Sequence, residues 1–349
     1  MSVRNLKLGG TDLTDEGLAY ADANDTNDEM ITTSKEFKIF GDGGDYSSFV
    51  GHSATKASVS IISSGDIYQL NLTTGAFTSK NIDFESPVLI AKCKADSTYA
   101  FAVESVAGDF ESALTSDSGD TWTTKTTGNF SAKINSISVP TTSLIVLGGE
   151  DAGGNNIIYS TDDGATWNDP TTAPSATINC VDMFDGTTGY AVDSFNNIWK
   201  TTDGGDTWAD TTDDSVNTNA LTSILAISAT KAIISMFSSN CYGGIILYDN
   251  TAGTVTKKIY VNGLKICSGI IESTNGNLYA MFSAIQADNA GAVNPAIVKS
   301  TDDGATWTVI NCPLTLDDTG EAEDCYRLSE CGANVIGFTS EYSILILVQ

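Results

Sequence analysis

Ser160-Thr161-Asp162-Asp163-Gly164-Ala165-Thr166-Trp167 is the stretch that decides the fold, because the 349-residue chain repeats its pattern. The same pattern, [ST]-x-D-x-G-x-T-W, occurs again at residues 115–122, 201–208 and 300–307. A pattern repeated along one chain indicates repeated structural units, each of which buries its apolar face against its neighbours. We therefore expect these residues to shape the architecture rather than to form one active site.

Each position of the pattern suits a tight turn between two strands. An Asp carboxylate can accept hydrogen bonds from backbone N–H groups of its own turn. Gly adopts a backbone conformation that other residues avoid, and Trp covers the turn with a large apolar ring. The residues to which these structural roles are assigned are Asp117, Gly119, Trp122, Asp162, Gly164, Trp167, Asp203, Gly205, Trp208, Asp302, Gly304 and Trp307.

These segments resemble the Asp-box of the bacterial neuraminidase repeat, which occurs in sialidases, sortilin-type receptors, some glycosidases and photosystem assembly factors. Every defining position matches in the four copies. The resemblance implies an all-β fold, a single β-propeller in which each box is the hairpin turn between the third and fourth strands of a blade. It also implies that the box Asp residues are structural and neither bind metal nor catalyse.

The spacing of the boxes gives the size of the repeat. Successive box Asp residues are 45, 41 and 99 residues apart, and the longest interval leaves room for a further copy. A degenerate copy lies there, with Asn250 in the Asp place, and another precedes the set at Asn71. Turns with a period near 45 residues fit four-stranded propeller blades.

Short β-branched or aromatic segments between Gly, Asn and Asp clusters predict the strands. In one unit they are 178–184, 189–193, 197–201 and 208–210, and in another 266–272, 277–283, 296–300 and 307–310.

The two ends of the chain predict how the ring closes. Strands are predicted at 325–329, 334–339 and 343–348, and the chain then ends without a fourth. Residues 36–40 are the candidate for the missing strand, since pairing there would hide two open sheet edges. We expect seven four-stranded blades closed by the N- and C-terminal strands, with six or eight as alternatives. Residues 35–349 would then form the propeller and residues 1–34 a short N-terminal arm.

Composition limits the partners. A net charge of −27 argues against binding to nucleic acid phosphates and to anionic membranes. The acidic, lysine-poor composition suits either a halophilic protein or one that simply needs solubility. Residues 1–10 lack the apolar core of a secretory signal, and no stretch is long and apolar enough for membrane insertion.

Two scarce residue types exclude several kinds of chemistry. Sialidases of the resembled family hold a substrate carboxylate with three arginines, whereas this chain has only Arg4 and Arg327. Sialidase activity is therefore disfavoured, and the assembly-factor alternative suffers too, because that group carries an arginine patch. His52 is the only histidine, which excludes His-based triads and multi-His metal centres. We expect His52 to lie in a surface loop.

Acidic residues leave two further sites open. A glycosidase needs only two carboxylates, and Glu104, Glu150, Asp182, Asp185, Asp193 and Glu272 lie near the ends of predicted strands. The pattern singles out no pair, so no catalytic residue is assigned. Asp42 and Asp45, and Asp317 and Asp318, are weak candidates for Ca²⁺, which favours clustered oxygens; no other cofactor is expected.

The seven cysteines are an odd number. Cys93, Cys180, Cys267 and Cys325 fall in predicted first strands, where we expect small buried side chains. A disulfide between Cys312 and Cys325 is an open alternative.

The N-terminal arm lies outside the repeat. Its sequence GLxxxDxND, carried by Gly17, Leu18, Asp22, Asn24 and Asp25, resembles a phrase near the start of tail-fibre and other virion proteins of tailed viruses. The arm is too polar to fold alone, so it is either a disordered tail or a segment that orders on a partner. The candidate docking residues are Leu13, Leu18, Tyr20, Asp22, Asn24 and Asp25.

Together these features favour a non-enzymatic virion structural protein, used as a decoration, a fibre head or a host-attachment module. The arm would bind other virion proteins, the protein would be oligomeric in the particle, and propeller loops would meet a glycan or protein on the host surface. The alternatives are a glycoside hydrolase that uses a carboxylate pair, and a cellular propeller scaffold.

Overall fold

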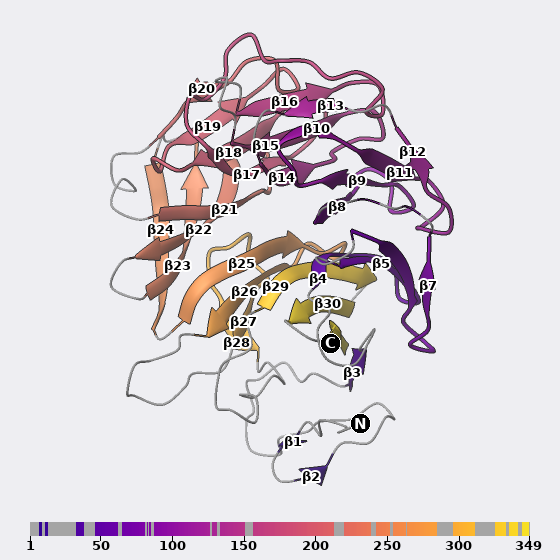
Figure 1. Ribbon diagram of the computed structural model, residues 1–349. Helices are drawn as coiled ribbons and strands as arrows, with labels where there is room; N and C mark the ends of the chain where they lie inside the picture. The colour runs from indigo at the N-terminus through magenta and orange to yellow at the C-terminus, as the bar shows by residue number, and fades with distance from the viewer. Residues whose placement is uncertain are drawn as a thin grey trace.

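The protein is all-β in the computed structural model (Figure 1). The structure describes residues 7–8, 11–12, 33–37, 46–61, 65–80, 82, 84, 87–125, 128–130, 133–150, 156–212, 220–238, 242–251, 254–262, 264–284, 296–310, 325–332, 335–340 and 344–348. Within these ranges no helix of a length and apolarity suited to crossing a membrane occurs.

Antiparallel sheets stand around a common centre, and the chain passes from one sheet to the next (Figure 1). The first is β4 (Tyr46–Ser53), β5 (Lys56–Ile61), β6 (Ile67–Asn71) and β7 (Phe77–Ser79). The second is β8 (Val88–Lys92), β9 (Ala100–Glu104), β11 (Ser112–Thr115) and β12 (Thr123–Thr124). The third is β14 (Ile134–Ser138), β15 (Ile145–Gly149) and β16 (Ile157–Ser160), where a bridge between Tyr159 and Asn168 stands in for a fourth strand.

The later sheets repeat this order. They are β17 (Ile178–Met183), β18 (Gly189–Asp193), β19 (Ile198–Thr201) and β20 (Ala209–Asp210); β21 (Ala220–Ala226), β22 (Lys231–Ser238), β23 (Tyr242–Asp249) and β24 (Thr254–Asn262); and β25 (Leu264–Glu272), β26 (Leu278–Ala284), β27 (Ala296–Ser300) and β28 (Thr308–Ile310). Radial four-stranded antiparallel sheets of this kind define a β-propeller. The strands predicted for the two sample units overlap the observed ones and differ by at most two residues at any end.

The last sheet joins the two ends of the chain. It contains β29 (Cys325–Gly332), β30 (Val335–Ser340) and β31 (Ile344–Val348), and its fourth strand is β3 (Thr33–Phe37) from the N-terminal part. β3 pairs antiparallel with β31, so that Thr33 faces Val348 and Phe37 faces Ile344. This strand begins three residues before the predicted 36–40, and residues 38–40 lie outside the described residues.

Two small sheets stand apart from this order. β1 (Lys7–Leu8) pairs with β2 (Thr11–Asp12) in the N-terminal part. β10 (Gly108–Phe110) pairs with β13 (Gly128–Phe130) beside the second sheet, and both Phe110 and Phe130 are fully buried. The sequence pattern predicted neither sheet.

Apolar side chains fill the space between neighbouring sheets. Between the fourth and fifth sheets, Tyr190 and Val192 of β18 pack with Ile234 of β22 and Tyr248 of β23. The Tyr190 and Tyr248 rings meet edge to face at 6.1 Å, and the Tyr248 hydroxyl donates to the carbonyl of Thr211 at 2.6 Å. Burial of these large side chains between sheets, rather than within one, makes each sheet depend on the next.

Hydrogen bonds from side chains also link neighbouring innermost strands. Ser136 Oγ on β14 accepts from the Val181 amide of β17 at 3.1 Å and donates to the Val181 carbonyl at 3.3 Å. Ser48 on β4 makes the same two-way contact with Ile90 on β8. Further links of this kind join Asn179 to Leu221, Ser138 to Met183, and Ser329 of the last sheet to Gly51 of the first.

The four boxes share one set of hydrogen bonds, which Asp162 illustrates. Its carboxylate accepts from the Thr166 amide at 2.8 Å, the Thr166 hydroxyl at 2.7 Å and the Ser160 hydroxyl at 2.9 Å. Ser160 Oγ also accepts from the Gly164 amide at 2.9 Å. The matching contacts occur at Asp117, Asp203 and Asp302.

The glycine of the box has two reasons for its identity. Gly164 has a φ of +78°, a conformation that favours glycine. A Cβ atom there would lie 2.7 Å from the Phe101 ring of the preceding sheet. The turn therefore lies directly against its neighbour and fixes the spacing of the sheets.

The box tryptophans cover the turns in two ways. Trp208 and Trp307 donate their ring N–H to the carbonyls of Gly205 and Gly304 at 3.0 and 3.1 Å. Trp167 instead packs edge-on against Phe101 of β9, in the preceding sheet, and against Phe110 of the small β10–β13 sheet.

The degenerate boxes also occupy turns between third and fourth strands. Asn71 Oδ1 accepts from the amides of Thr73 and Thr74 at 2.9 and 3.0 Å, as a box Asp would. At the other turn, Asp249 accepts from the Thr251 amide at 2.9 Å, whereas Asn250 Oδ1 accepts from the Tyr248 hydroxyl at 3.1 Å.

The box contacts predict the effect of two substitutions. Trp167→Ala removes an aromatic ring from the boundary between two sheets and should lower the free energy of unfolding by about 3 kcal/mol. Asp162→Ala removes the acceptor of the turn hydrogen bonds and should cost about 1–2 kcal/mol. Denaturant unfolding of both variants measures these losses, with the exposed Thr161→Ala as a matched control that stays near the parent. Parent-like stability of both variants would contradict a structural role for the box.

Candidate functional site

A central cavity of about 680 Å³ is the candidate functional site. Its walls come from the innermost strands of the radial sheets, namely β4, β8, β14, β17, β21, β25 and β29. Each of these strands stands at one end of the strand order of its sheet. A concave site of this volume accommodates a small molecule.

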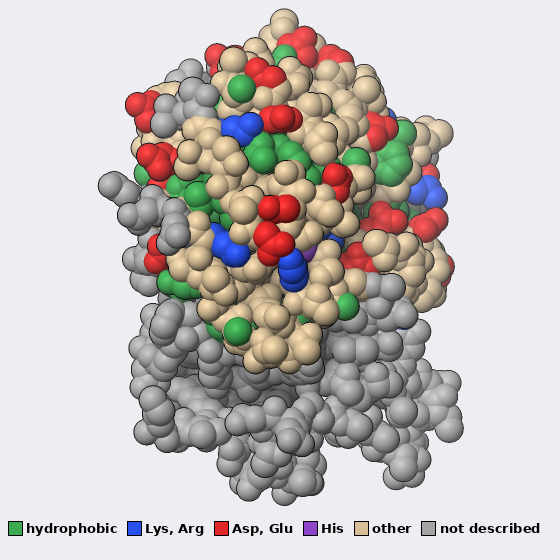
Figure 2. Space-filling view, turned by 90° about the vertical axis from the view of Figure 1, so that its right-hand side faces the viewer, with side chains coloured by type: hydrophobic (Ala, Val, Ile, Leu, Met, Phe, Trp, Pro, Cys, Tyr) green, Lys and Arg blue, Asp and Glu red, His purple; other side chains and the backbone are tan. Residues whose placement is uncertain are grey.

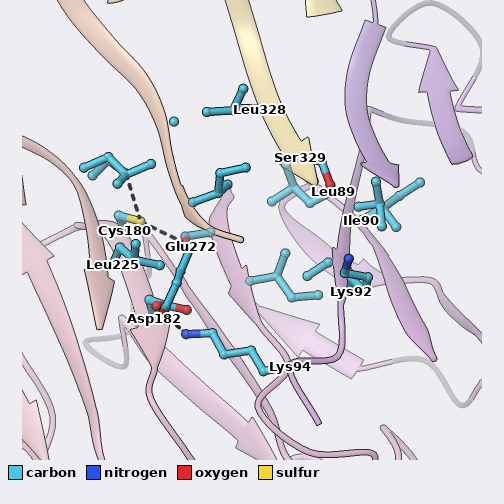
Figure 3. Close-up of a pocket in the computed structure, with 18 of the residues that line it drawn as sticks. Leu89, Ile90, Lys92, Lys94, Cys180, Asp182, Leu225, Glu272, Leu328 and Ser329 are labelled. Atoms are coloured by element: carbon cyan, nitrogen blue, oxygen red, sulfur yellow. Dashed lines mark hydrogen bonds and ion pairs between the residues drawn. The ribbon is translucent and has the colours of Figure 1, made fainter. Parts of the chain in front are cut away.

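One ion pair crosses the cavity wall. Lys94, which follows β8, places Nζ 2.7 Å from Oδ2 of Asp182 on β17 (Figure 3). Asp182 also accepts from the Ser138 hydroxyl at 3.1 Å and from the Ala226 amide at 2.9 Å. The carboxylate thereby connects the second, third, fourth and fifth sheets, and both of its oxygens are engaged.

Glu272, at the end of β25, lies beside this ion pair (Figure 3). The cavity walls limit hydration of its carboxylate and raise its pKa, whereas the Lys94 ammonium acts in the opposite direction. The negative charges of Asp303 and Asp182 raise the pKa further. Burial and the neighbouring negative charges thus favour the protonated form of the Glu272 side chain.

A second polar group lies where the last sheet meets its neighbours. Glu330 on β29 is buried, and its Oε1 accepts from both the amide and the hydroxyl of Thr274 at 2.8 Å. Lys92 on β8 is half-buried and donates to the Glu330 carbonyl at 3.4 Å. Burial lowers the pKa of Lys92, and the Glu330 charge opposes that shift.

The other carboxylates singled out in the sequence have structural surroundings. Asp193 is fully buried and accepts from the amides of Phe195 and Asn197, the Asn197 side chain and the Trp199 ring N–H. Asp185 caps a turn through Thr187 and Thr188. Glu104 is buried and accepts from the Glu111 amide at 3.0 Å, and Glu150 is exposed. Of the six, the structure brings only Asp182 and Glu272 together in the cavity.

The expectation for His52 is wrong. We expected a surface loop, but His52 lies within β4 with 6% of its surface exposed. Its Nε2 lies 2.8 Å from Ser58 Oγ, and Gly119 of the first box packs over this pair. Burial lowers the pKa of His52 to about 4. The sequence pattern did not reveal β4 as a strand, because its last residues are small apart from the single His. Alternation of side chains along the strand would have placed His52 on one face of a sheet.

Three cysteine thiols lie in or next to innermost strands. Cys180 is on β17 at the cavity wall, where Ser136 donates to its sulfur at 3.6 Å. Cys93 directly follows β8, and Cys331 is on β29; both are buried. Burial raises the pKa of Cys331 to about 12, so its thiol stays protonated. Cys267 and Cys325 have their backbones in β25 and β29, and Cys312 lies outside the described residues.

Several predicted sites fall outside the described part of the chain. These are the docking residues Leu13, Leu18, Tyr20, Asp22, Asn24 and Asp25, and the Ca²⁺ candidates Asp42, Asp45, Asp317 and Asp318. Across the residues that the structure does describe, no group of three or more His, Cys, Asp or Glu could hold a metal ion.

The fold is similar to those of solved propeller proteins. A GH74 enzyme from Niastella koreensis matches with a TM-score of 0.66 and 19% identity, over 88% of this chain and 53% of that one. Virginiamycin B lyase from Staphylococcus aureus, in a catalytically inactive form with quinupristin, matches with a TM-score of 0.65 and 13% identity, over 90% and 99%. YCF48 from Cyanidioschyzon merolae matches with a TM-score of 0.57 and 11% identity, over 90% and 98%.

These likenesses establish a β-propeller and, at such low identity, the fold alone. The chain spans about half the length of the GH74 enzymes that it matches. No family model matches the sequence, and no curated protein matches it.

The buried His52 predicts a loss of stability in mild acid. In the unfolded chain the imidazole takes up a proton near pH 6.5, whereas in the folded chain it does so only near pH 4. Stability is therefore complete above about pH 6.5 and falls as the pH drops towards 4, by about 2 kcal/mol at pH 5. Urea unfolding at pH 7.5 and pH 5 measures the change, and His52→Gln should reduce it strongly. An equal pH dependence in the variant would show that other groups cause the loss.

Proposed function

We propose that the ring has seven blades and that the two ends of the chain close it. The pairing of β3 with β31 supports this, because it completes a fourth strand in the last sheet. The Gly51 amide of β4 donates to Ser329 Oγ of β29 at 3.0 Å, so the first and last sheets also meet at the centre. In Figure 1 the last strands, β29 and β30, lie beside β4 and β5.

Closure predicts different outcomes for trimming the two ends. Deletion of residues 344–349 removes β31, which pairs with both β30 and β3, and should leave unpaired edges and an aggregating protein. Deletion of residues 1–32 keeps β3 and should leave the propeller folded. Size-exclusion chromatography and circular dichroism distinguish the two, and a monomeric, folded 344–349 deletion would refute closure.

We infer that the protein is a non-enzymatic virion structural protein. The position of β3 carries this inference, because it is the outermost strand of its sheet. The N-terminal end of β3 therefore lies at the outer edge of the sheet, away from the cavity, and we propose that the segment before it binds another virion protein. The resemblance of residues 17–25 to virion proteins indicates that the partner is another virion protein. A propeller docked in this way would be present in many copies in the particle.

The surface suits a module that meets other surfaces through its loops. On the described part of the face in Figure 2, acidic side chains are more common than Lys and Arg and lie scattered. Such a surface repels nucleic acid and anionic lipid and is screened by salt or divalent cations. A glycan or protein on a host surface is the partner that we propose for the loops, and a saline habitat would account for the excess of acid.

A glycoside hydrolase is the second candidate, because Asp182 and Glu272 share the cavity and the pKa of Glu272 is raised. A general acid of this reaction needs a raised pKa. Asp182 fits a nucleophile poorly, since Lys94, Ser138 and Ala226 already bind its oxygens. A cellular scaffold remains a third alternative, and nothing in the described residues favours it.

Deletion of the arm tests the virion role. A protein lacking residues 1–32 should be folded and soluble yet absent from purified particles, because it lacks the docking segment. The matched control is the full-length chain with Asp162→Ala, which perturbs the propeller and keeps the arm. Incorporation of the arm-deleted protein at normal levels would refute anchoring by the arm.

Assays on the intact chain separate the enzyme from the structural protein. We expect no glycan hydrolysis above that of the Glu272→Gln variant. Hydrolysis that Glu272→Gln abolishes, with folding retained, would favour the glycosidase instead.

A further inference from the structure

The walls of the central cavity are polar, and several of their side chains form hydrogen bonds with the neighbouring strands. Ser48, Asn135, Ser136 and Asn179 all bond to backbone atoms of the adjacent innermost strand. Asp182 and Glu330 are held by neighbouring sheets in the same way. These contacts link neighbouring strands and occupy part of the hydrogen-bonding capacity of the cavity walls.

Lys92 is the cavity cation without an ion-pair partner among the described residues, whereas Lys94 is paired with Asp182. An ammonium has three N–H donors, and the hydrogen bond that the structure shows for Lys92 is a long one, 3.4 Å, to the Glu330 carbonyl. Among the described residues no carboxylate lies within ion-pair distance of it, and the nearby Glu330 carboxylate is oriented by Thr274. Among the described residues, Lys92 is therefore a half-buried ammonium of the cavity wall without an ion-pair partner, in a chain with 44 acidic and 17 basic residues.

The second lysine of the cavity is arranged differently. Lys94 reaches across to Asp182 beside Glu272, and Lys92 lies apart from this group (Figure 3). The two lysines are two residues apart at the end of β8, so both belong to the same wall. Leu89, Leu225 and Leu328 add apolar surface to the lining.

We propose that the cavity binds a small organic anion whose carboxylate or phosphate group pairs with Lys92. An anion there would fill the open donors and offset the cost of holding an ammonium away from water. The neutral body of the ligand would contact the leucine side chains, and the 680 Å³ cavity has room for a molecule of monosaccharide size. This binding goes beyond the virion role and does not depend on it.

Titration of the full-length protein with matched sugars tests the site. Glucuronate and glucose 6-phosphate carry the carboxylate and the phosphate, and glucose is their neutral counterpart. We expect calorimetry to detect at least one of the two anions, with a Kd of about 1 mM or lower, and no glucose binding. Whichever anion binds identifies the preferred group. Absence of binding by both anions at about 10 mM, or equal binding of glucose, overturns the proposal.

Two variants locate the bound anion. Lys92→Gln removes the charge and should weaken anion binding at least about tenfold. Lys200→Gln removes the same charge from a lysine outside the cavity, which donates to the Ala229 carbonyl, and should bind as the parent does. Equal affinity of the Lys92→Gln variant overturns the assignment.

A labelling experiment needs no variant and decides the matter if Lys92→Gln does not fold. Acetylation of the unaltered protein with an amine-reactive ester, read by mass spectrometry, reports the accessibility of each lysine. The bound anion should slow acetylation of Lys92 and leave that of Lys200 unchanged. Unchanged acetylation of Lys92 in the presence of a bound anion shows that the anion binds elsewhere.

Discussion

Hydrogen bonds from side chains of one innermost strand to the backbone of the next are the constraint on which this structure depends. Strand pairing operates within a sheet and cannot hold one sheet to another. Ser48 and Ser136 each satisfy both the N–H and the C=O of one residue on the neighbouring strand. Because an unpaired buried backbone group is costly, these contacts fix the angle at which successive sheets meet. The innermost strands that these contacts connect also form the walls of the central cavity.

The box turns contact the neighbouring sheet at a second place, away from the innermost strands. Gly164 lies against Phe101 of the preceding sheet, and Trp167 packs on Phe101 and Phe110. Each turn therefore organises its own hairpin and also marks where the neighbouring sheet must stand. That double duty explains why the pattern repeats so strictly in a chain whose other segments vary.

The sequence predicted what short-range chemistry determines. Asp, Gly and Trp at fixed offsets specify a turn by themselves, and in the two units for which strands were predicted the observed strands lie within two residues of the prediction. The burial of His52 and the two-stranded β10–β13 sheet escaped prediction because long-range packing decides both. In the cavity, Asp182 and Glu272 are 90 residues apart, and only the ring brings them together. The sequence did not single out Lys92, because whether a lysine has an ion-pair partner depends on which carboxylates lie near it in space.

Within the described part of the chain, several lysines lie at boundaries between sheets. Lys56 of the first sheet pairs with Asp120 of the first box, in the second sheet, and Lys80 donates to the Asp120 carbonyl. Lys94 joins the second sheet to the fourth, and Lys200 joins the fourth to the fifth through Ala229. A uniformly acidic surface tends to push sheets apart by charge repulsion, and cations at the boundaries oppose it locally. The exposed Lys56–Asp120 pair is screened by salt, whereas the Lys94–Asp182 pair, whose carboxylate is shielded within the cavity wall, is screened much less. Salt therefore acts in opposite directions on this protein, reducing the repulsion across its surface while weakening only the outermost of the links that hold the sheets together.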